Sequence, residues 1–170
     1  MKINWKSIFE LEQKQFEAMS EAERFVYFLL LQYKGKYLWG KETPEGSDCS
    51  GAVCLALCAS TGLLIRTTAN DLYKRVFTKP QTKNGINAAF FIDKKNTAVH
   101  VAGLLDEGVV LNSQEPTARI RALPDISKWF EKEGCRTEIR GLDRAALEKL
   151  SREGKTVYDL DGEFKKYFEV

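Results

Sequence analysis

The sequence lacks several features that are typical of metal-binding, nucleic-acid-binding and membrane proteins. It holds one histidine, and three of its four cysteines follow the spacing CxxxxCxxxC, which matches no zinc-binding signature. The formal net charge is only +2, whereas a protein held mainly to nucleic acid usually shows a clear basic excess. The longest apolar run, 25–31, is far shorter than the roughly twenty residues that span a bilayer. We therefore expect no metal or other cofactor, no nucleic-acid partner and no membrane insertion.

The cysteines are expected to be free thiols. Cys54 and Cys58 are one helical turn apart, which separates their Cβ atoms by about 6 Å, whereas a disulfide needs about 3.8 Å. Cys135 has no obvious partner. Residues 1–12 mix charged with apolar side chains and do not resemble a secretory signal. At 170 residues, we expect one domain over 1–170, cytoplasmic on synthesis.

The pattern of apolar residues, caps and turns predicts helices before strands. Ser20 and Glu23 form a capping box in front of the apolar run 25–31, and Asp106-Glu107-Gly108 is typical of a hairpin turn. The predicted helices cover 5–18, 21–33, 49–60, 69–77, 125–133 and 143–153. The predicted strands cover 88–92, 98–105, 109–112 and 135–139, while 36–48 is predicted to be a loop. This order indicates an α+β fold with N-terminal helices packed on a small antiparallel sheet.

One group of residues has the composition needed for nucleophilic chemistry. Cys49 lies at the predicted start of a helix, whose unpaired N–H groups and partial positive charge would stabilise a thiolate or an oxyanion. The one available imidazole base is His100, on a predicted strand. Twelve residues later, Asn112 lies on the partner strand of the hairpin. Pairing would bring its amide oxygen to the imidazole N–H, and a protonated His100 would lower the pKa of Cys49.

Spacing alone leaves a second interpretation open. An isolated cysteine at a helix start is more often an inert core thiol, as we expect for Cys54 and Cys58. A lone strand histidine is also most often a satisfied, partly buried residue. The excess of basic residues in 61–121, nine basic against five acidic, is explained by a solvated surface about as well as by binding of an anionic substrate.

Several local motifs carry a resemblance to a known family. They are Tyr37-Leu38-Trp39-Gly40-Lys41-Glu42-Thr43-Pro44, Ser47-Asp48-Cys49-Ser50-Gly51, Arg66-Thr67-Thr68 and His100-Val101-Ala102-Gly103, followed by Trp129 and 136–139. In this order and spacing the chain resembles the NlpC-type cell-wall cysteine peptidases over about 21–140. The segments 1–20 and 141–170 lie outside the resemblance.

The resemblance implies a papain-like fold and hydrolysis of peptidoglycan stem peptides between D-isoglutamate and a diamino acid. Cys49 would be the nucleophile, His100 the general base and Asn112 the residue that orients the imidazole. Tyr37 would lie over the thiolate, and Asp48, Ser50 and Thr68 would contact substrate. The chain departs from the family pattern at Lys41, where a second glycine is usual, at Ser47 in place of a bulky residue, and at Ala102 in place of glycine.

Other functions stay open beside this one. The setting we expect is a phage-type lysis or tail enzyme that reaches the cell wall by a route without a signal peptide. The alternatives are a secreted effector and a cytoplasmic enzyme that recycles imported stem peptides. A non-catalytic virion or binding component of the same fold is a further alternative, as is a thiol amidase or acyltransferase. Neither the oligomeric state nor the diamino acid follows from the sequence.

Overall fold

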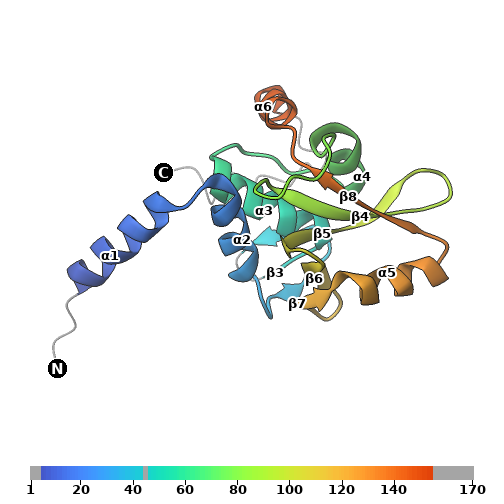
Figure 1. Ribbon diagram of the computed structural model, residues 1–170, viewed down its shortest axis with the longest axis horizontal. Coiled ribbons are helices and arrows are strands. Elements are labelled where there is room, and N and C mark those ends of the chain that lie inside the picture. The colour runs from blue at the N-terminus through green and yellow to red at the C-terminus, as the bar shows by residue number, and fades with distance from the viewer. Residues whose placement is uncertain (1–4, 44–45, 155–170) are drawn as a thin grey trace.

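The computed structural model describes residues 5–43 and 46–154, and it has the α+β fold expected from the sequence (Figure 1). Eight strands form one sheet in the order β2-β3-β1-β7-β6-β5-β4-β8, antiparallel except where β1 pairs with β3. The strands are β1 (Lys36–Tyr37), β2 (Glu42–Thr43), β3 (Gly46–Ser47), β4 (Asn87–Ile92), β5 (Ala98–Asp106), β6 (Val109–Gln114), β7 (Thr117–Ala122) and β8 (Arg136–Gly141). The helices are α1 (Trp5–Ala18), α2 (Glu21–Leu30), α3 (Cys49–Thr61), α4 (Ala69–Asp71), the π-helical turn η1 (Leu72–Val76), α5 (Leu123–Lys132) and α6 (Arg144–Glu153).

Strand β4 is buried on both faces, which explains its unbroken apolar sequence. Because side chains alternate along a strand, Phe90 joins the core beneath α2 and α3, and Phe91 joins the core beneath α5. The sheet therefore separates two apolar clusters. One packs the N-terminal helices, and the other packs α5.

Helix α3 begins and ends at residues whose local chemistry specifies both positions. Asp48 is the N-cap and accepts a hydrogen bond from the N–H of Gly51, and Gly62 closes the helix in the left-handed conformation. Gly51 has a second role, because a Cβ there would collide with the backbone carbonyl of Lys41. The first turn of α3 can therefore lie directly against the 38–41 loop.

Several predicted boundaries were wrong. Helix α2 ends at Leu30, before the predicted 33, in a turn where Lys34 has a positive φ. The predicted loop 36–48 contains three two-residue strands, and the predicted helix 69–77 is one α-helical turn followed by η1. Strand β7 was missed entirely. The short strands and β7 form by pairing with residues distant in the sequence, as in the match of Lys36 with Thr117, and local patterns do not report such pairing.

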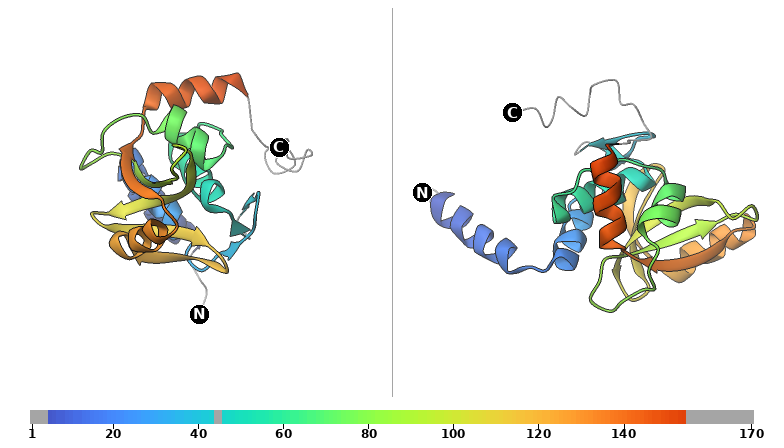
Figure 2. Two further views of the ribbon diagram at one scale, coloured as in Figure 1. Left: turned by 90° about the vertical axis from the view of Figure 1, so that its right-hand side faces the viewer. Right: turned by 90° about the horizontal axis from the view of Figure 1, so that it is seen from above.

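Helix α1 extends away from the rest of the molecule, as Figure 1 and the right-hand view of Figure 2 show. At its C-terminal end Phe16 makes edge contacts with Tyr27 and Phe28 of α2. At the other end of the chain, Leu147 and Leu150 of α6 join the core beneath α2 and α3. The rest of both predicted extensions, 1–4 and 155–170, lies outside the described residues. Among residues 5–43 and 46–154, no helix has the length and hydrophobicity of a membrane span.

Candidate active site

Cys49 is the first residue of α3 and lies against strand β5. Its side chain is 9% exposed, and the backbone N–H groups of Ser50 and Val101 donate hydrogen bonds to its sulfur. Val101 directly follows His100 on β5. The tertiary fold thus places the predicted nucleophile beside the residue that follows the predicted base on β5.

The expected contact between His100 and Asn112 is present. His100 Nε2 lies 2.6 Å from the amide oxygen Oδ1 of Asn112, and the Nδ2 of Asn112 donates to Oε1 of Gln114 at 3.1 Å. Because an amide oxygen only accepts, Nε2 carries the proton of the neutral ring. The other ring nitrogen, Nδ1, then holds the lone pair that accepts a proton. Gln114 sets this tautomer indirectly by fixing which end of the Asn112 amide faces the imidazole.

The ring of His100 is held between aromatic side chains. It stacks on Phe130 of α5, with centroids 5.1 Å apart and planes at 24°, and it lies 5.6 Å from the ring of Phe91. Burial among these groups lowers the pKa of His100 from 6.5 to about 4, against an opposing effect of the hydrogen bond to Asn112. The imidazole is therefore neutral at pH 7.

Burial also raises the pKa of Cys49, from 9.0 to about 11, and the neighbouring carboxylate of Asp48 adds to the rise. The hydrogen bonds from Val101 and Ser50 and the charge of Arg66 oppose it without reversing it. The expectation of a lowered pKa, based on the helix N-terminus and a protonated His100, was therefore wrong. Without bound substrate, the two groups are a neutral thiol and a neutral imidazole.

Beneath Cys49 lies a buried ion pair between Asp48 and Arg66. The guanidinium, with a fully buried side chain, donates from Nη2 to Asp48 Oδ2 at 2.9 Å and from Nη1 to Ser50 Oγ at 2.9 Å. The carboxylate also accepts from the N–H groups of Gly40 and Gly51 and from Ser50 Oγ. This network ties the 38–41 loop, the first turn of α3 and the 66–68 segment into one unit around the nucleophile.

The residues predicted to contact substrate lie around this unit, and their roles stay predictions. Asp48 and Ser50 are buried in the network just described. Thr68 is the N-cap of α4, where its hydroxyl accepts from the N–H of Asp71 at 3.1 Å. Tyr37 lies on β1, paired with Ser47 of the strand that leads into Asp48 and Cys49.

The three departures from the family pattern fit their surroundings. Gly40 takes the left-handed conformation, with φ of 74°, while Lys41 does not, so the lysine causes no backbone strain. Ser47 is buried and its hydroxyl donates to Oε1 of Gln32 at 3.2 Å. Ala102 packs in the core beneath α5.

Three residues of the site were not identified from the sequence: Gln114, Phe130 and, in its role as the partner of Asp48, Arg66. Arg66 was seen as part of a motif, but its ion pair crosses eighteen residues of chain. Phe130 follows Trp129 on the amphipathic helix α5. Its place in the helical pattern of apolar residues indicates burial and gives no sign of a contact with His100. Across the described ranges, no cluster of three or more His, Cys, Asp or Glu side chains could hold a metal ion.

Comparison with known proteins gives one sequence family and many similar structures. Residues 34–136 match the NlpC/P60 family. The structure of NlpC1 from Trichomonas vaginalis matches with 18% identity and a TM-score of 0.54 over 73% of this chain and 44% of that protein. The NlpC/P60 domain of the peptidoglycan hydrolase SagA matches with 20% identity and a TM-score of 0.53 over 71% of this chain and 97% of the domain.

A third similar structure belongs to a protein that is described as non-catalytic. RipD from Mycobacterium tuberculosis, described as a non-catalytic NlpC/P60 domain adapted to peptidoglycan binding, matches with 19% identity and a TM-score of 0.50 over 61% of this chain and 88% of its own. A search of curated proteins finds no match. The chain spans less than half of the Trichomonas protein, and at these identities the structures establish the fold alone.

Proposed function

The chain belongs to the NlpC/P60 family, and we propose that it is a cysteine peptidase that hydrolyses peptidoglycan stem peptides. The observation that carries the proposal is the bond of 2.6 Å between His100 Nε2 and Asn112 Oδ1. It leaves Nδ1 of a neutral imidazole as the proton acceptor, on the strand that hydrogen-bonds to Cys49.

In the first step the thiol of Cys49 attacks the carbonyl carbon of the scissile amide while its proton passes to Nδ1 of His100. General-base assistance of this kind contributes on the order of 10²–10⁴-fold to a rate. The N–H groups of Ser50 and Val101 point at the sulfur and stabilise the negative charge that develops there. Because burial favours the neutral thiol and the neutral imidazole, we propose that the proton transfer accompanies the attack.

In the second step the imidazolium returns the proton to the departing amine, the C–N bond breaks, and an S-acyl enzyme forms. Water then attacks the thioester with His100 again as base, which releases the acid product and the thiol. The oxyanion of each tetrahedral intermediate would lie at the first turn of α3, where the helix dipole is positive. In the described part of the chain, the N–H of Cys49 has no acceptor and is free to donate to it.

The bond we propose is the one between D-isoglutamate and the diamino acid, as the motif resemblance implies. For the setting we propose a phage-type lysis or tail hydrolase that acts on the cell wall. Purified protein should then release peptides from intact sacculi. An enzyme that recycles imported peptides would cleave free stem peptides only, and a secreted effector would act on sacculi from competing species.

The second candidate function is binding to peptidoglycan without cleavage, which the likeness to RipD brings forward. Such a domain needs no nucleophile or base, whereas Cys49, His100 and Asn112 are all present here. A thiol amidase or acyltransferase would use the same three groups on another acyl donor. Both alternatives are separated from the proposal by the products formed.

The experiment that tests the proposal is incubation with defined stem peptides and mass spectrometry of the products. The parent protein should cleave the D-isoglutamyl bond, Cys49→Ala should not, and Cys135→Ser should cleave normally as a matched thiol control. Retained cleavage by the Cys49→Ala protein, or binding without any cleavage by the parent, would refute the peptidase.

A further inference from the structure

A set of hydrogen bonds joins the segment that carries Cys49 to the strand that carries Asn112. It runs through three polar side chains: Gln32 in the turn after α2, Ser47 of β3 and Ser113 of β6. Gln32 is half-buried, and the two serines are buried, with 4% and 1% of their surface exposed. We call these three residues and the hydrogen bonds between them the polar bridge.

The sheet divides at the place that the polar bridge spans. Strands β5 and β6 end their pairing at Gly103 and Leu111. The next residues of β6, Asn112 and Ser113, pair with β7 alone among the described strands. In the order of the sheet, β6 is therefore connected to the strand before the nucleophile only indirectly, through β7 and β1.

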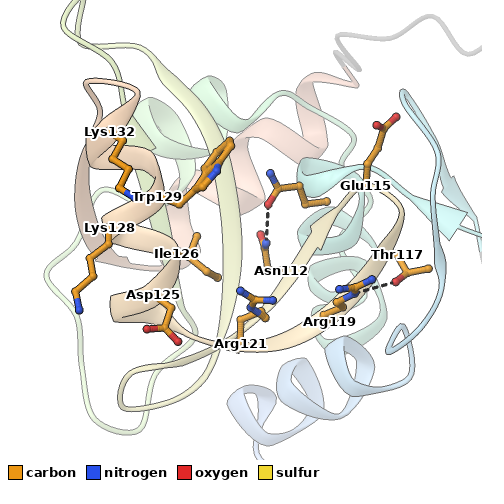
Figure 3. Close-up of a pocket in the computed structure, with 11 residues that line it drawn as sticks. Asn112, Glu115, Thr117, Arg119, Arg121, Asp125, Ile126, Lys128, Trp129 and Lys132 are labelled. Atoms are coloured by element: carbon orange, nitrogen blue, oxygen red, sulfur yellow. Dashed lines mark hydrogen bonds between the residues drawn. The ribbon is translucent and has the colours of Figure 1, made fainter.

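The side chain of Ser113 provides a direct connection, because its Oγ donates to the backbone carbonyl of Ser47 at 2.9 Å. Ser47 stands two residues before Cys49, and Ser113 directly follows Asn112. Since successive side chains of a strand point to opposite faces, Ser113 reaches Ser47 on one face while Asn112 reaches the imidazole on the other. There Asn112 borders a groove of about 460 Å³ between α5 and the β6–β7 hairpin, so packing from that face does not enclose it (Figure 3).

Gln32 holds the other end of the polar bridge. Its Oε1 accepts from Ser47 Oγ at 3.2 Å, and its Nε2 donates to the carbonyl of Ala52, near the start of α3, at 3.0 Å. The same Nε2 donates to the carbonyl of Phe28 in α2 at 3.2 Å. Reversal of the amide would place its oxygen against two carbonyl oxygens, so one orientation is specified. Gln32 thus ties β3 to α2 and to the helix that begins with the nucleophile.

The polar bridge depends on a residue at which this chain departs from the family pattern. A bulky apolar side chain is usual where Ser47 stands, and such a side chain could not donate to Gln32. Buried polar groups add little net stability compared with apolar side chains of the same size. A fully hydrogen-bonded network does specify one relative position of the segments that it connects.

We propose that Gln32 and Ser113 are positioning residues that act through Ser47. Together they hold the segment of Cys49 and the segment of Asn112 at a fixed separation. Because Asn112 orients the imidazole, this separation sets the place of the base relative to the nucleophile. The inference rests on the proposed peptidase function and adds to it residues that do not react themselves.

The test compares Ser113→Ala, which removes the hydroxyl, with Ser113→Thr, which restores it. The matched control is Ser60→Ala, because Ser60 is also buried, at 4% exposed, and its hydroxyl donates to the carbonyl of Leu57 at 3.2 Å within α3. On a stem peptide, Ser113→Ala should lower kcat about ten- to a hundredfold, since a displacement of about 1 Å can cost about 10²-fold. KM should change little, because the buried Ser113 cannot contact substrate. Ser113→Thr should recover most of kcat, and Ser60→Ala should match the parent protein.

A second readout needs no turnover. The proton on Nε2 of His100 lies in the hydrogen bond of 2.6 Å to Asn112, so it should give a slowly exchanging, downfield NMR signal from the one labelled histidine. Ser113→Ala should broaden or abolish this signal, while Ser113→Thr and Ser60→Ala should keep it. A purely structural role would lower the Tm of Ser113→Ala and Ser60→Ala alike and leave both kcat and the imidazole signal unchanged. That result would overturn the proposal.

Gln32→Met tests the other end of the polar bridge, because it keeps the length of the side chain and removes the amide. It should also lower kcat with little change in KM. The double variant Gln32→Met/Ser113→Ala should lose little more than the more affected single variant, since both residues act through Ser47. Losses that multiply would show two independent contacts and would contradict a single bridge.

The two proposals fail in different ways. Cleavage by the parent protein, with an unchanged kcat and imidazole signal in Ser113→Ala, would refute the polar bridge and leave the peptidase intact. Absence of cleavage by the parent, with an imidazole signal that is lost in Ser113→Ala and kept in Ser60→Ala, would refute the peptidase and support the bridge as the device that positions Asn112.

Discussion

Acid should destabilise this protein through one side chain, His100. The imidazole is buried against Phe91 and Phe130, and its pKa falls from 6.5 in the unfolded chain to about 4 in the folded protein. Between these two values the unfolded state binds the proton and the folded state does not. The free energy of unfolding therefore falls as the pH drops from 6.5 towards 4, and the contribution of neutral His100 is complete above pH 6.5.

The size of the effect follows from the displacement of the pKa. Each unit corresponds to about 1.4 kcal/mol, so lowering the pH from 7 to 5 should cost about 2 kcal/mol of stability through His100. With a urea m-value of about 2 kcal/mol per molar, the unfolding midpoint should move down by about 1 M. Carboxylates with lowered pKa values, such as Glu138 and Asp143, add their own losses in acid.

Comparison with His100→Gln isolates the contribution of the histidine to the pH dependence of stability. The variant keeps the carboxylate titrations and loses the imidazole. Between pH 7 and 5 its urea unfolding midpoint should therefore fall by about 1 M less than that of the parent protein. His100 is also the only histidine of the chain, so selective ¹⁵N labelling gives one imidazole signal whose titration reports the pKa directly.

Parallel loss of stability in both proteins, or an imidazole pKa above 6.5, would refute this reasoning. A raised pKa would mean that His100 is held as an imidazolium, and its contribution to stability would then disappear as the pH rises through the folded-state pKa. The sign of the pH dependence thus distinguishes a neutral resting pair from a preformed thiolate–imidazolium pair with Cys49.

Three further predictions address the site. Asn112→Ala should lower kcat less than His100→Ala, as measured by initial rates on a stem peptide. For His100→Ala the expected loss is on the order of 10²–10⁴-fold. Equal losses in folded proteins would mean that Asn112 does more than orient the ring. Arg66→Met should cost about 3–5 kcal/mol in a thermal melt, because it leaves the buried carboxylate of Asp48 without its partner, and an unchanged Tm would contradict that view of the ion pair. Alkylation of Cys49 by iodoacetamide, measured by peptide mapping, should be slow at pH 6. Its rate should rise with pH towards the folded-state pKa of about 11. A rate that is already maximal at pH 6 would show a preformed thiolate.

The sequence by itself determined the elements whose signals are local. The capping box at Ser20 and the glycine at 62 correctly placed the start of α2 and the end of α3, because a cap satisfies backbone groups within one turn of itself. The hairpin between β5 and β6 was also predicted, since Gly108 takes the left-handed conformation that its turn requires. From these elements and the motifs, Cys49, His100 and Asn112 could be named as one candidate site.

Only the tertiary structure decided the properties that depend on what surrounds a residue. A helix N-terminus predicts a lowered thiol pKa, yet burial and Asp48 reverse the direction for Cys49. Likewise, Arg119 and Arg121 are two of many scattered cations in the sequence, and they form a groove with α5 only because β7 pairs with β6 in one register. Desolvation and charge clustering act through space, between groups that the chain separates and the sheet brings together, so a local pattern cannot report them.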